Sequence, residues 1–227
     1  MIDITRSVET PPSLERQTDD CLRATDVLEA LHADFSGKCY LCERRYELPV
    51  YEVDHRRPQA AFPAHRFSWA NLFPICEACN KRRPKAWPAG GMLSPGHFQQ
   101  LEARLVQRLD YGPDDALEPA FAPDDGADDE AINTAAELTR IHDNKTDRQS
   151  ASAAIKGQDL RSAIHRALCA ALDLACNYQR LLRTAPNSPQ RAFTEQALRR
   201  RLSRRAPYTA LLRSRFADLP AIAALFD

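Results

Sequence analysis

Apolar residues along most of this chain recur every three or four positions, which is the spacing of one face of an α-helix. The clearest stripes lie in residues 20–35, 130–142 and 150–183, and the longest consists of Ile164, Leu168, Leu172, Ala175, Tyr178 and Leu182. The dipeptide Ser188-Pro189 predicts another helix start, because serine caps helix N-termini and proline suits the first turn. With two or three helices expected in residues 189–227, the fold is predicted to be mainly α.

Residues 36–85 interrupt this helical pattern. Residues 38–54 carry strand-favouring side chains and predict two short strands with a turn at Arg44-Arg45. Three prolines in residues 56–75 predict an irregular loop, and a short helix is expected after Cys76, ending near Pro84. The pattern indicates a small β-containing module inside a helical chain.

We therefore divide the chain into an N-terminal arm and helix (1–35), the module (36–90) and a helical scaffold (91–227). Within the scaffold, residues 97–109 place Phe98, Leu101 and Leu105 on one helical face, which predicts a helix. Residues 110–130 contain nine acidic residues and no basic residue, which predicts a solvated loop. Masking of a basic groove is the alternative interpretation of this charge.

Composition narrows the classes of protein. The 227 residues include 31 basic and 31 acidic side chains, so any nucleic-acid surface must arise from local segregation of charge. No apolar run approaches the ~18 residues of a membrane span. The first 20 residues lack the apolar stretch of a signal peptide, so we expect a cytoplasmic protein. Its thiols should then be reduced, which favours metal ligands or buried residues over disulfides.

Four of the seven cysteines form two CxxC pairs, and the other three are expected to be small core residues. The pairs, Cys39/Cys42 and Cys76/Cys79, are separated by 33 residues. Two such pairs supply the four thiolates of a tetrahedral zinc site. We predict a structural Zn²⁺ that stabilises the module, because four sulfur ligands leave no open position for catalysis. Four buried or redox-active thiols are the alternative.

Between the pairs lie residues suited to hydrolytic chemistry. Asp54 and His55 follow each other at the end of a predicted strand, and Asn80 directly follows the last cysteine. At a strand end the chain can turn, so Asp54 could hold a metal ion while His55 faces a water molecule. The zinc site would then hold Asp54, His55 and Asn80 together.

The order CxxC, DHxxP, NL and CxxCN resembles the HNH endonucleases, and this resemblance implies a ββα-metal fold within the mainly helical chain. It implies that Cys39, Cys42, Cys76 and Cys79 bind the structural zinc and that His55 is the general base. It further implies that Asp54 and Asn80 bind one catalytic divalent ion, Mg²⁺ or Mn²⁺. Asn71 matches the middle motif position, which braces the loop that orients the base.

These roles agree with what phosphodiester hydrolysis requires. A base must deprotonate the attacking water, and a hard cation must stabilise charge on the phosphate and leaving group. We expect a nuclease acting on nucleic acid, with DNA as the first candidate substrate. Two alternatives remain, a free-standing restriction-type HNH enzyme and a non-catalytic, zinc-stapled nucleic-acid-binding subunit.

A second resemblance extends beyond the module. The N-terminal pattern MIxIxR…PPxxL and the helix that ends in GKCYLCE are similar to PtuB-type nucleases of bacterial Septu and retron anti-phage systems. In those systems the nuclease pairs with an ABC-like ATPase. The resemblance implies a defence effector with such an ATPase as partner.

Basic side chains cluster in sequence around the motif. We expect phosphate contacts from Arg56, Arg57, Lys81, Arg82 and Arg83, with solvated surface charge as the alternative. Residues 191–215 add eight arginines. For these, a solvated face, a phosphate-binding surface and a partner-docking surface all remain open.

Overall fold

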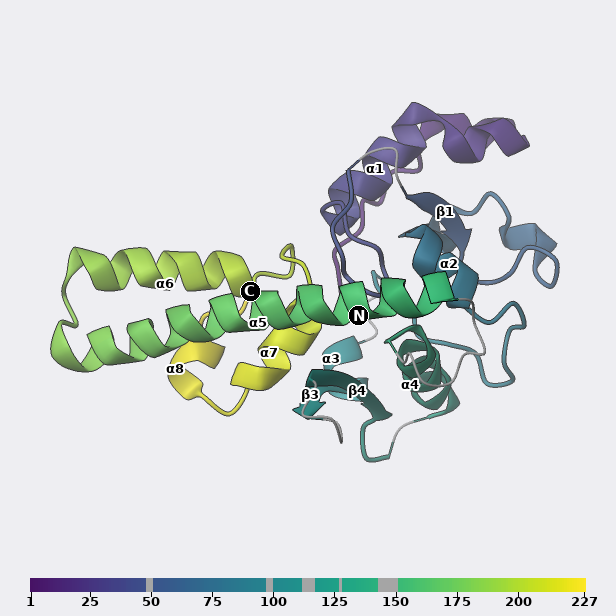
Figure 1. Ribbon diagram of the computed structural model, residues 1–227. Helices are drawn as coiled ribbons and strands as arrows, with labels where there is room; N and C mark the ends of the chain where they lie inside the picture. Colours follow the sequence, from purple (N-terminus) through teal and green to yellow (C-terminus); the bar gives the residue numbers. More distant parts are fainter. Residues whose placement is uncertain (48–50, 97–99, 112–116, 127, 143–150) are drawn as a thin grey trace.

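The computed structural model describes residues 1–47, 51–96, 100–111, 117–126, 128–142 and 151–227. About half of the chain is helical, and two small antiparallel sheets complete it. In Figure 1 the long helix α5 (Ala151–Thr184) crosses the molecule. One end carries the first sheet and the N-terminal helix, and the other carries the hairpin of α5 and α6 (Pro189–Leu202).

The N-terminal segment forms two 3-10 turns and one α-helix. The turns η1 (Pro12–Arg16) and η2 (Asp19–Arg23) precede α1 (Thr25–Phe35), which buries Val27, Leu31 and Phe35. Gly37 ends this helix at a φ of +69°, where its N–H donates to the carbonyl of His32 at 2.8 Å. A Cβ at Gly37 would lie 2.8 Å from the His32 ring, so glycine fits both the angle and the space.

The first sheet differs from the predicted one. Strand β1 (Glu52–His55) pairs antiparallel with β2 (Leu72–Ile75), and His55 lies opposite Leu72. The expected hairpin within residues 38–54 is reduced to one bridge between Lys38 and Arg45. The prediction of an irregular loop over 56–75 was wrong at its end, where Leu72–Ile75 form β2. Pro74 has no N–H to donate, but it can stand in this strand because its carbonyl still accepts a hydrogen bond. That carbonyl accepts from the N–H of Tyr40 at 2.9 Å.

Helix α2 (Glu77–Arg82) follows β2 directly, so the predicted short helix after Cys76 is confirmed. All four residues of β2 are buried, whereas β1 is only partly buried. The order β1, β2, α2 therefore places the second cysteine pair at the junction between a buried strand and a helix.

The second sheet replaces a predicted helix and part of a predicted loop. Helix α3 (Leu101–Arg104) has a single turn, and β3 (Leu105–Tyr111) then pairs with β4 (Leu117–Pro123). Leu105 and Gln107 are buried at alternate positions, which is the period of a strand. Leu101 and Leu105 also fit a helical period, so the apolar spacing alone could not separate the two structures. Phe98 lies outside the described residues.

The remaining helices agree with the sequence pattern. Helix α4 (Asp129–His142) and α5 match the predicted stripes, and three helices follow. These are α6, α7 (Thr209–Phe216) and α8 (Pro220–Ala223). Ser188 caps α6, since its Oγ accepts from the N–H of Arg191 at 3.2 Å. None of the described helices combines the length and apolar character needed to cross a bilayer.

One continuous apolar core joins the three parts of the chain. It contains Phe35 of α1, Phe73 of β2, Leu138 of α4 and Ile164 of α5. The small module therefore packs directly on the helical scaffold.

Candidate metal centre and active site

The four CxxC cysteines converge on one point. Their Sγ atoms all lie within 4.8 Å of one another, and all four side chains are buried. The Sγ atoms of Cys42 and Cys76 are 4.0 Å apart. Four sulfurs at ~2.3 Å from a tetrahedral zinc would be separated by about 3.8 Å. The cluster therefore has the chemistry and size of a structural zinc site, as predicted.

Local backbone geometry prepares the first cysteine pair. The N–H of Glu43 donates to the carbonyl of Cys39 at 3.0 Å, and the N–H of Cys39 donates to the carbonyl of Arg44, also at 3.0 Å. Glu43 adopts a φ of +56°, which turns the chain sharply behind Cys42. Hydrogen bonds within the cluster hold the pKa of the Cys76 thiol far below its usual range and raise the pKa of Cys42 and of Cys79. Among these thiols Cys76 is therefore the one most readily held as a thiolate, the form that binds zinc.

His55 ends β1 with its ring oriented by a backbone carbonyl. Its Nε2 lies 2.8 Å from the carbonyl oxygen of Arg66. A carbonyl can only accept, so Nε2 carries a proton, and in the neutral ring Nδ1 is then the acceptor. The ring is half-buried and lines an open pocket of about 870 Å³ together with Tyr51 and Glu52. This is the tautomer and the setting that a general base requires.

Asn71 holds the loop that orients His55. Its Oδ1 accepts from the N–H of Arg57 at 2.7 Å, and its Nδ2 donates to the carbonyls of Arg57 and His65, both at 3.1 Å. Because it bonds to both Arg57 and His65, the buried Asn71 side chain ties the two ends of the loop together. Arg66, whose carbonyl holds His55, follows His65 directly.

Asp54 is engaged by protein groups. Its Oδ2 accepts from the Tyr40 hydroxyl at 2.7 Å and also from Nη1 of Arg83. Arg83 donates further to the carbonyls of His55 and Arg56. The Asp54 side chain is only 10% exposed. Its charge is balanced by the guanidinium of Arg83, which is also nearly buried.

Asn80 contacts a different carboxylate. Its side-chain amide donates to Glu52, an exposed residue of β1. Asn80 and Asp54 therefore have different hydrogen-bond partners, and their joint role as ligands of a catalytic ion stays a prediction. Sequence reasoning missed Glu52, although strand alternation places it on the same face as Asp54.

Three of the five arginine and lysine side chains expected on phosphates are buried, which corrects that prediction for them. Arg56, Arg82 and Arg83 are 1%, 6% and 8% exposed. Nη1 of Arg82 donates to the carbonyl of Ile141 at 2.8 Å. Arg57 and Lys81 remain exposed, and Lys81 pairs with Glu77.

A carboxylate of the scaffold neutralises the two buried arginines next to the Asp54-His55 pair. Glu137 of α4 lies 2.5 Å from Nη1 of Arg56 and 3.3 Å from Nε of Arg83. Burial lowers the pKa of Arg56, but the charges and hydrogen bonds of Glu137 and Tyr40 together keep that pKa above its ordinary value. Helix α4 thus helps to position the strand end that carries His55.

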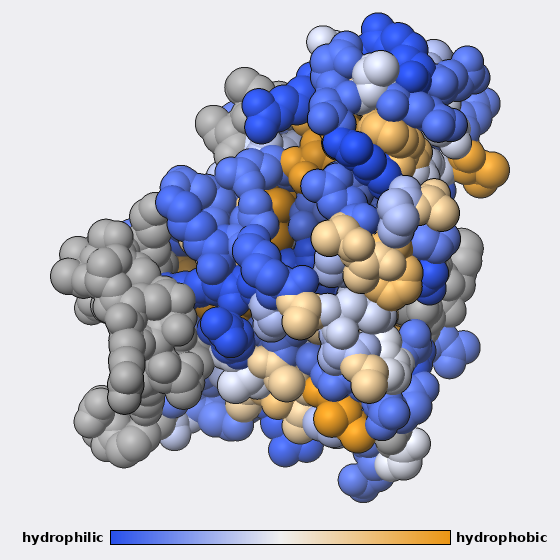
Figure 2. Space-filling model, turned by 90° about the vertical axis from the view of Figure 1, so that its right-hand side faces the viewer, coloured by the Kyte–Doolittle hydropathy of each residue, from blue (hydrophilic) through white to orange (hydrophobic). Residues whose placement is uncertain are grey.

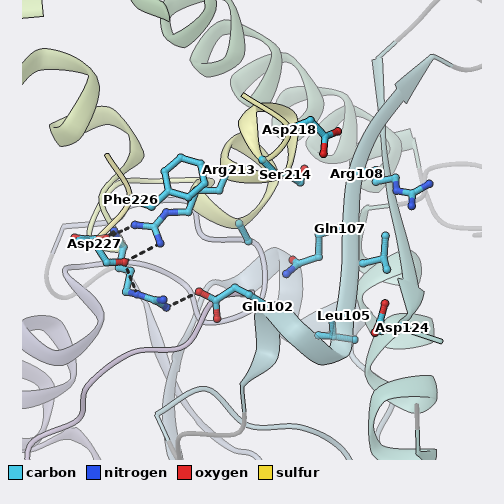
Figure 3. A pocket seen from close by; sticks show the side chains of 14 residues that line it. Glu102, Leu105, Gln107, Arg108, Asp124, Arg213, Ser214, Asp218, Phe226 and Asp227 are labelled. Atoms are coloured by element: carbon cyan, nitrogen blue, oxygen red, sulfur yellow. Dashed lines mark hydrogen bonds and ion pairs between the residues drawn. The ribbon is translucent and has the colours of Figure 1, made fainter. Parts of the chain in front are cut away.

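The surroundings of the site are mainly polar. Figure 2 shows a largely hydrophilic face at the end of the molecule that is on the right in Figure 1, with apolar residues in small separate groups. A second pocket, of about 560 Å³, lies between β3 and α7 (Figure 3). Its arginines Arg204 and Arg213 are paired with Glu102 and Asp227. The pocket at His55 therefore remains the candidate active site.

No family model, curated protein or solved structure matches this chain.

Proposed function

We propose that this protein is a metal-dependent endonuclease of the HNH type, which hydrolyses phosphodiester bonds of nucleic acid, with DNA as the first substrate to test. The observation that carries the proposal is the orientation of His55. Its Nε2 donates to the Arg66 carbonyl, which leaves Nδ1 as the acceptor of the neutral ring, and His55 lines an open pocket. That geometry supports removal of a proton from a water molecule by Nδ1.

Other residues support His55 in this role. The Asn71 side chain bridges Arg57 and His65, so the loop that holds the histidine cannot shift without breaking buried hydrogen bonds. The four-cysteine cluster lies at the start of α2, and a zinc ion there would fix β2 and α2 relative to each other. A preorganised base is what catalysis in a small module needs.

The catalytic ion is the part of the proposal that the donor set fits least. Mg²⁺ and Mn²⁺ prefer oxygen ligands, and the resemblance assigns Asp54 and Asn80 to this role. Asp54 is paired with Arg83 and Asn80 with Glu52, so these contacts would have to open before the two side chains could bind an ion. We therefore assign no catalytic step to the ion, which would supply stabilisation of negative charge when bound.

The biological setting is also a proposal. The N-terminal pattern and the GKCYLCE segment support a nuclease effector of an anti-phage system that works with an ABC-like ATPase. The ion pair between Asp54 and Arg83 favours one competing function, a zinc-stapled nucleic-acid-binding subunit without catalysis. Such a subunit needs no free carboxylate for a metal ion, so the pairing of Asp54 with Arg83 would not impair its function.

A cleavage assay separates these functions. Plasmid, single-stranded DNA and tRNA are incubated with the protein and Mg²⁺, Mn²⁺ or EDTA, with His55→Ala as a parallel sample. We expect divalent-dependent cleavage that is lost in the variant. Asp54→Ala should abolish rescue by added metal, and Asn80→Ala should raise the metal concentration required. Binding of nucleic acid without cleavage under every condition would favour the non-catalytic subunit.

A further inference from the structure

Three distant segments bring arginines together beside the zinc cluster. Arg44 and Arg45 belong to the turn after Cys42, Arg166 belongs to α5, and Arg205 follows α6. Nη2 of Arg45 donates to the backbone carbonyl of Arg205 at 2.6 Å, across 160 residues of sequence. We call these four arginines the knuckle patch.

Tyr208 lies at the centre of the knuckle patch. Its hydroxyl accepts from Nε of Arg44 at 3.4 Å. Burial raises the pKa of Tyr208, while the hydrogen bond from Arg44 and the charges of Arg44 and Arg166 act in the opposite direction. Arg45, Arg166 and Arg205 are exposed. The patch therefore presents positive charge to solvent from three elements.

The position of the patch is set by buried contacts. Nζ of Lys38, which is itself buried, donates to the backbone carbonyls of Arg204 and Ala206. These bonds hold the turn after α6 against the start of the cysteine turn. The backbone N–H of Tyr208 adds a bond to the carbonyl of Glu43 at 3.4 Å. The backbone that carries Arg44, Arg45 and Arg205 is thus fixed before any ligand arrives, which reduces the entropy lost on binding.

None of these four arginines forms an ion pair among the residues that the structure describes. Four arginines of the C-terminal region do form ion pairs: Arg191 and Arg199 with Glu195, Arg204 with Glu102, and Arg213 with Asp227. Because the whole chain has no net charge, an unpaired group of four arginines is a local segregation of charge.

We propose that the knuckle patch binds the phosphate backbone of the nucleic acid that the His55 pocket cleaves, an inference that rests on the proposed nuclease function for its substrate. Arginine forms paired hydrogen bonds with phosphate oxygens. A protein partner would need apolar anchors, and the exposed large apolar side chains lie on other segments: Val8, Tyr111, Ile132, Phe193 and Leu219. The patch replaces the phosphate contacts that the burial of Arg56, Arg82 and Arg83 removes.

Binding measurements test the patch independently of cleavage. The triple variant Arg45→Gln, Arg166→Gln, Arg205→Gln is placed in a His55→Ala background, and its affinity for a fluorescent 20-base-pair duplex is measured over a range of salt. The matched control removes three other exposed arginines, Arg108, Arg183 and Arg215. We expect the patch variant to bind at least about tenfold more weakly and its salt slope to fall by ~0.9 for each lost phosphate contact. The control should keep both.

Equal losses in the two triple variants would overturn the patch, as would equal affinity of the parent protein for a polyglutamate peptide of matched charge. Zinc content and the far-ultraviolet circular dichroism spectrum report on folding. The double variant Arg166→Gln, Arg205→Gln leaves the cysteine turn untouched and should show the same direction of change. If the protein with His55 intact cleaves nothing but the patch variant loses binding selectively, the nuclease function fails and the patch stands. If the protein with His55 intact cleaves nucleic acid but the patch variant binds like the control, the nuclease function stands and the knuckle patch fails.

Discussion

The β1–β2–α2 module and the α5–α6 hairpin are stabilised in opposite ways. The hairpin consists of long helices whose buried residues repeat at helical spacing, and its ion pairs, such as Arg191–Glu195, are part-exposed. The module has strands of four residues and a helix of six. It depends on four buried cysteines and on buried arginines that share Glu137. Local periodicity therefore explains the first region, and specific long-range partners explain the second.

This difference also decides what the chain could reveal beforehand. The helices α4, α5 and α6 were predicted from spacing and from the Ser188 cap, because helical contacts are local. Strand β2 was missed because a proline in the sequence suggests a loop. Only the tertiary structure shows that Pro74 lies opposite Val53 and accepts a hydrogen bond from Tyr40. The paired CxxC motifs predicted the cysteine cluster, since each motif brings two sulfurs together by itself.

The sequence motif identified which residues belong to the candidate site, but it predicted fewer of the contacts that these residues make. His55 and Asn71 lie in one hydrogen-bonded loop, as the motif implied. The burial of Arg56 could not be foreseen, because its partner Glu137 is 81 residues away. The contact of Asn80 with Glu52, rather than Asp54, likewise depends on how α2 packs on β1. These are tertiary choices that residue spacing does not encode.

The strongest way to separate the two regions is to remove the metal site. Cys76→Ala should abolish binding of about one zinc per chain and unfold the module, since structural zinc contributes on the order of 10 kcal/mol to such modules. Metal analysis and hydrogen exchange would measure both effects. Cys169→Ala, an exposed cysteine on α5, is the control and should change neither. A purified parent protein without zinc would contradict the prediction.

The next comparison sets a buried carboxylate against an exposed one. Glu137→Gln should lower the free energy of unfolding by about 3–5 kcal/mol, because the buried Arg56 loses its counter-charge and Arg83 keeps only that of Asp54. Glu195→Gln removes the partner of Arg191 and Arg199 in α6 and should cost only ~0.2–1 kcal/mol. Urea denaturation of both variants gives the comparison. Equal losses would mean that the burial of the Glu137 cluster adds nothing to its strength.

Chemistry and stability should separate at His55. His55→Ala should reduce cleavage by ~10²-fold or more, because the general base is lost. The ring is half-buried at a strand end, and its removal should leave zinc content and the cooperative unfolding transition in place. Initial cleavage rates on the substrate identified for the parent protein provide the measurement. Unchanged turnover in the variant would remove His55, and with it the HNH mechanism, from consideration.

The smallest expected effect lies at the start of α6, where stability comes from local structure. Ser188→Ala removes the oxygen that accepts from the N–H of Arg191 and should lower the free energy of unfolding by about 1 kcal/mol. Ser188→Asp keeps an acceptor at the same position and should restore the loss. The four-cysteine cluster has no contact with this cap, so zinc affinity should be equal in all three proteins. A cap variant that loosens zinc would show instead that the hairpin and the module unfold as one cooperative unit, which their shared apolar core makes physically reasonable.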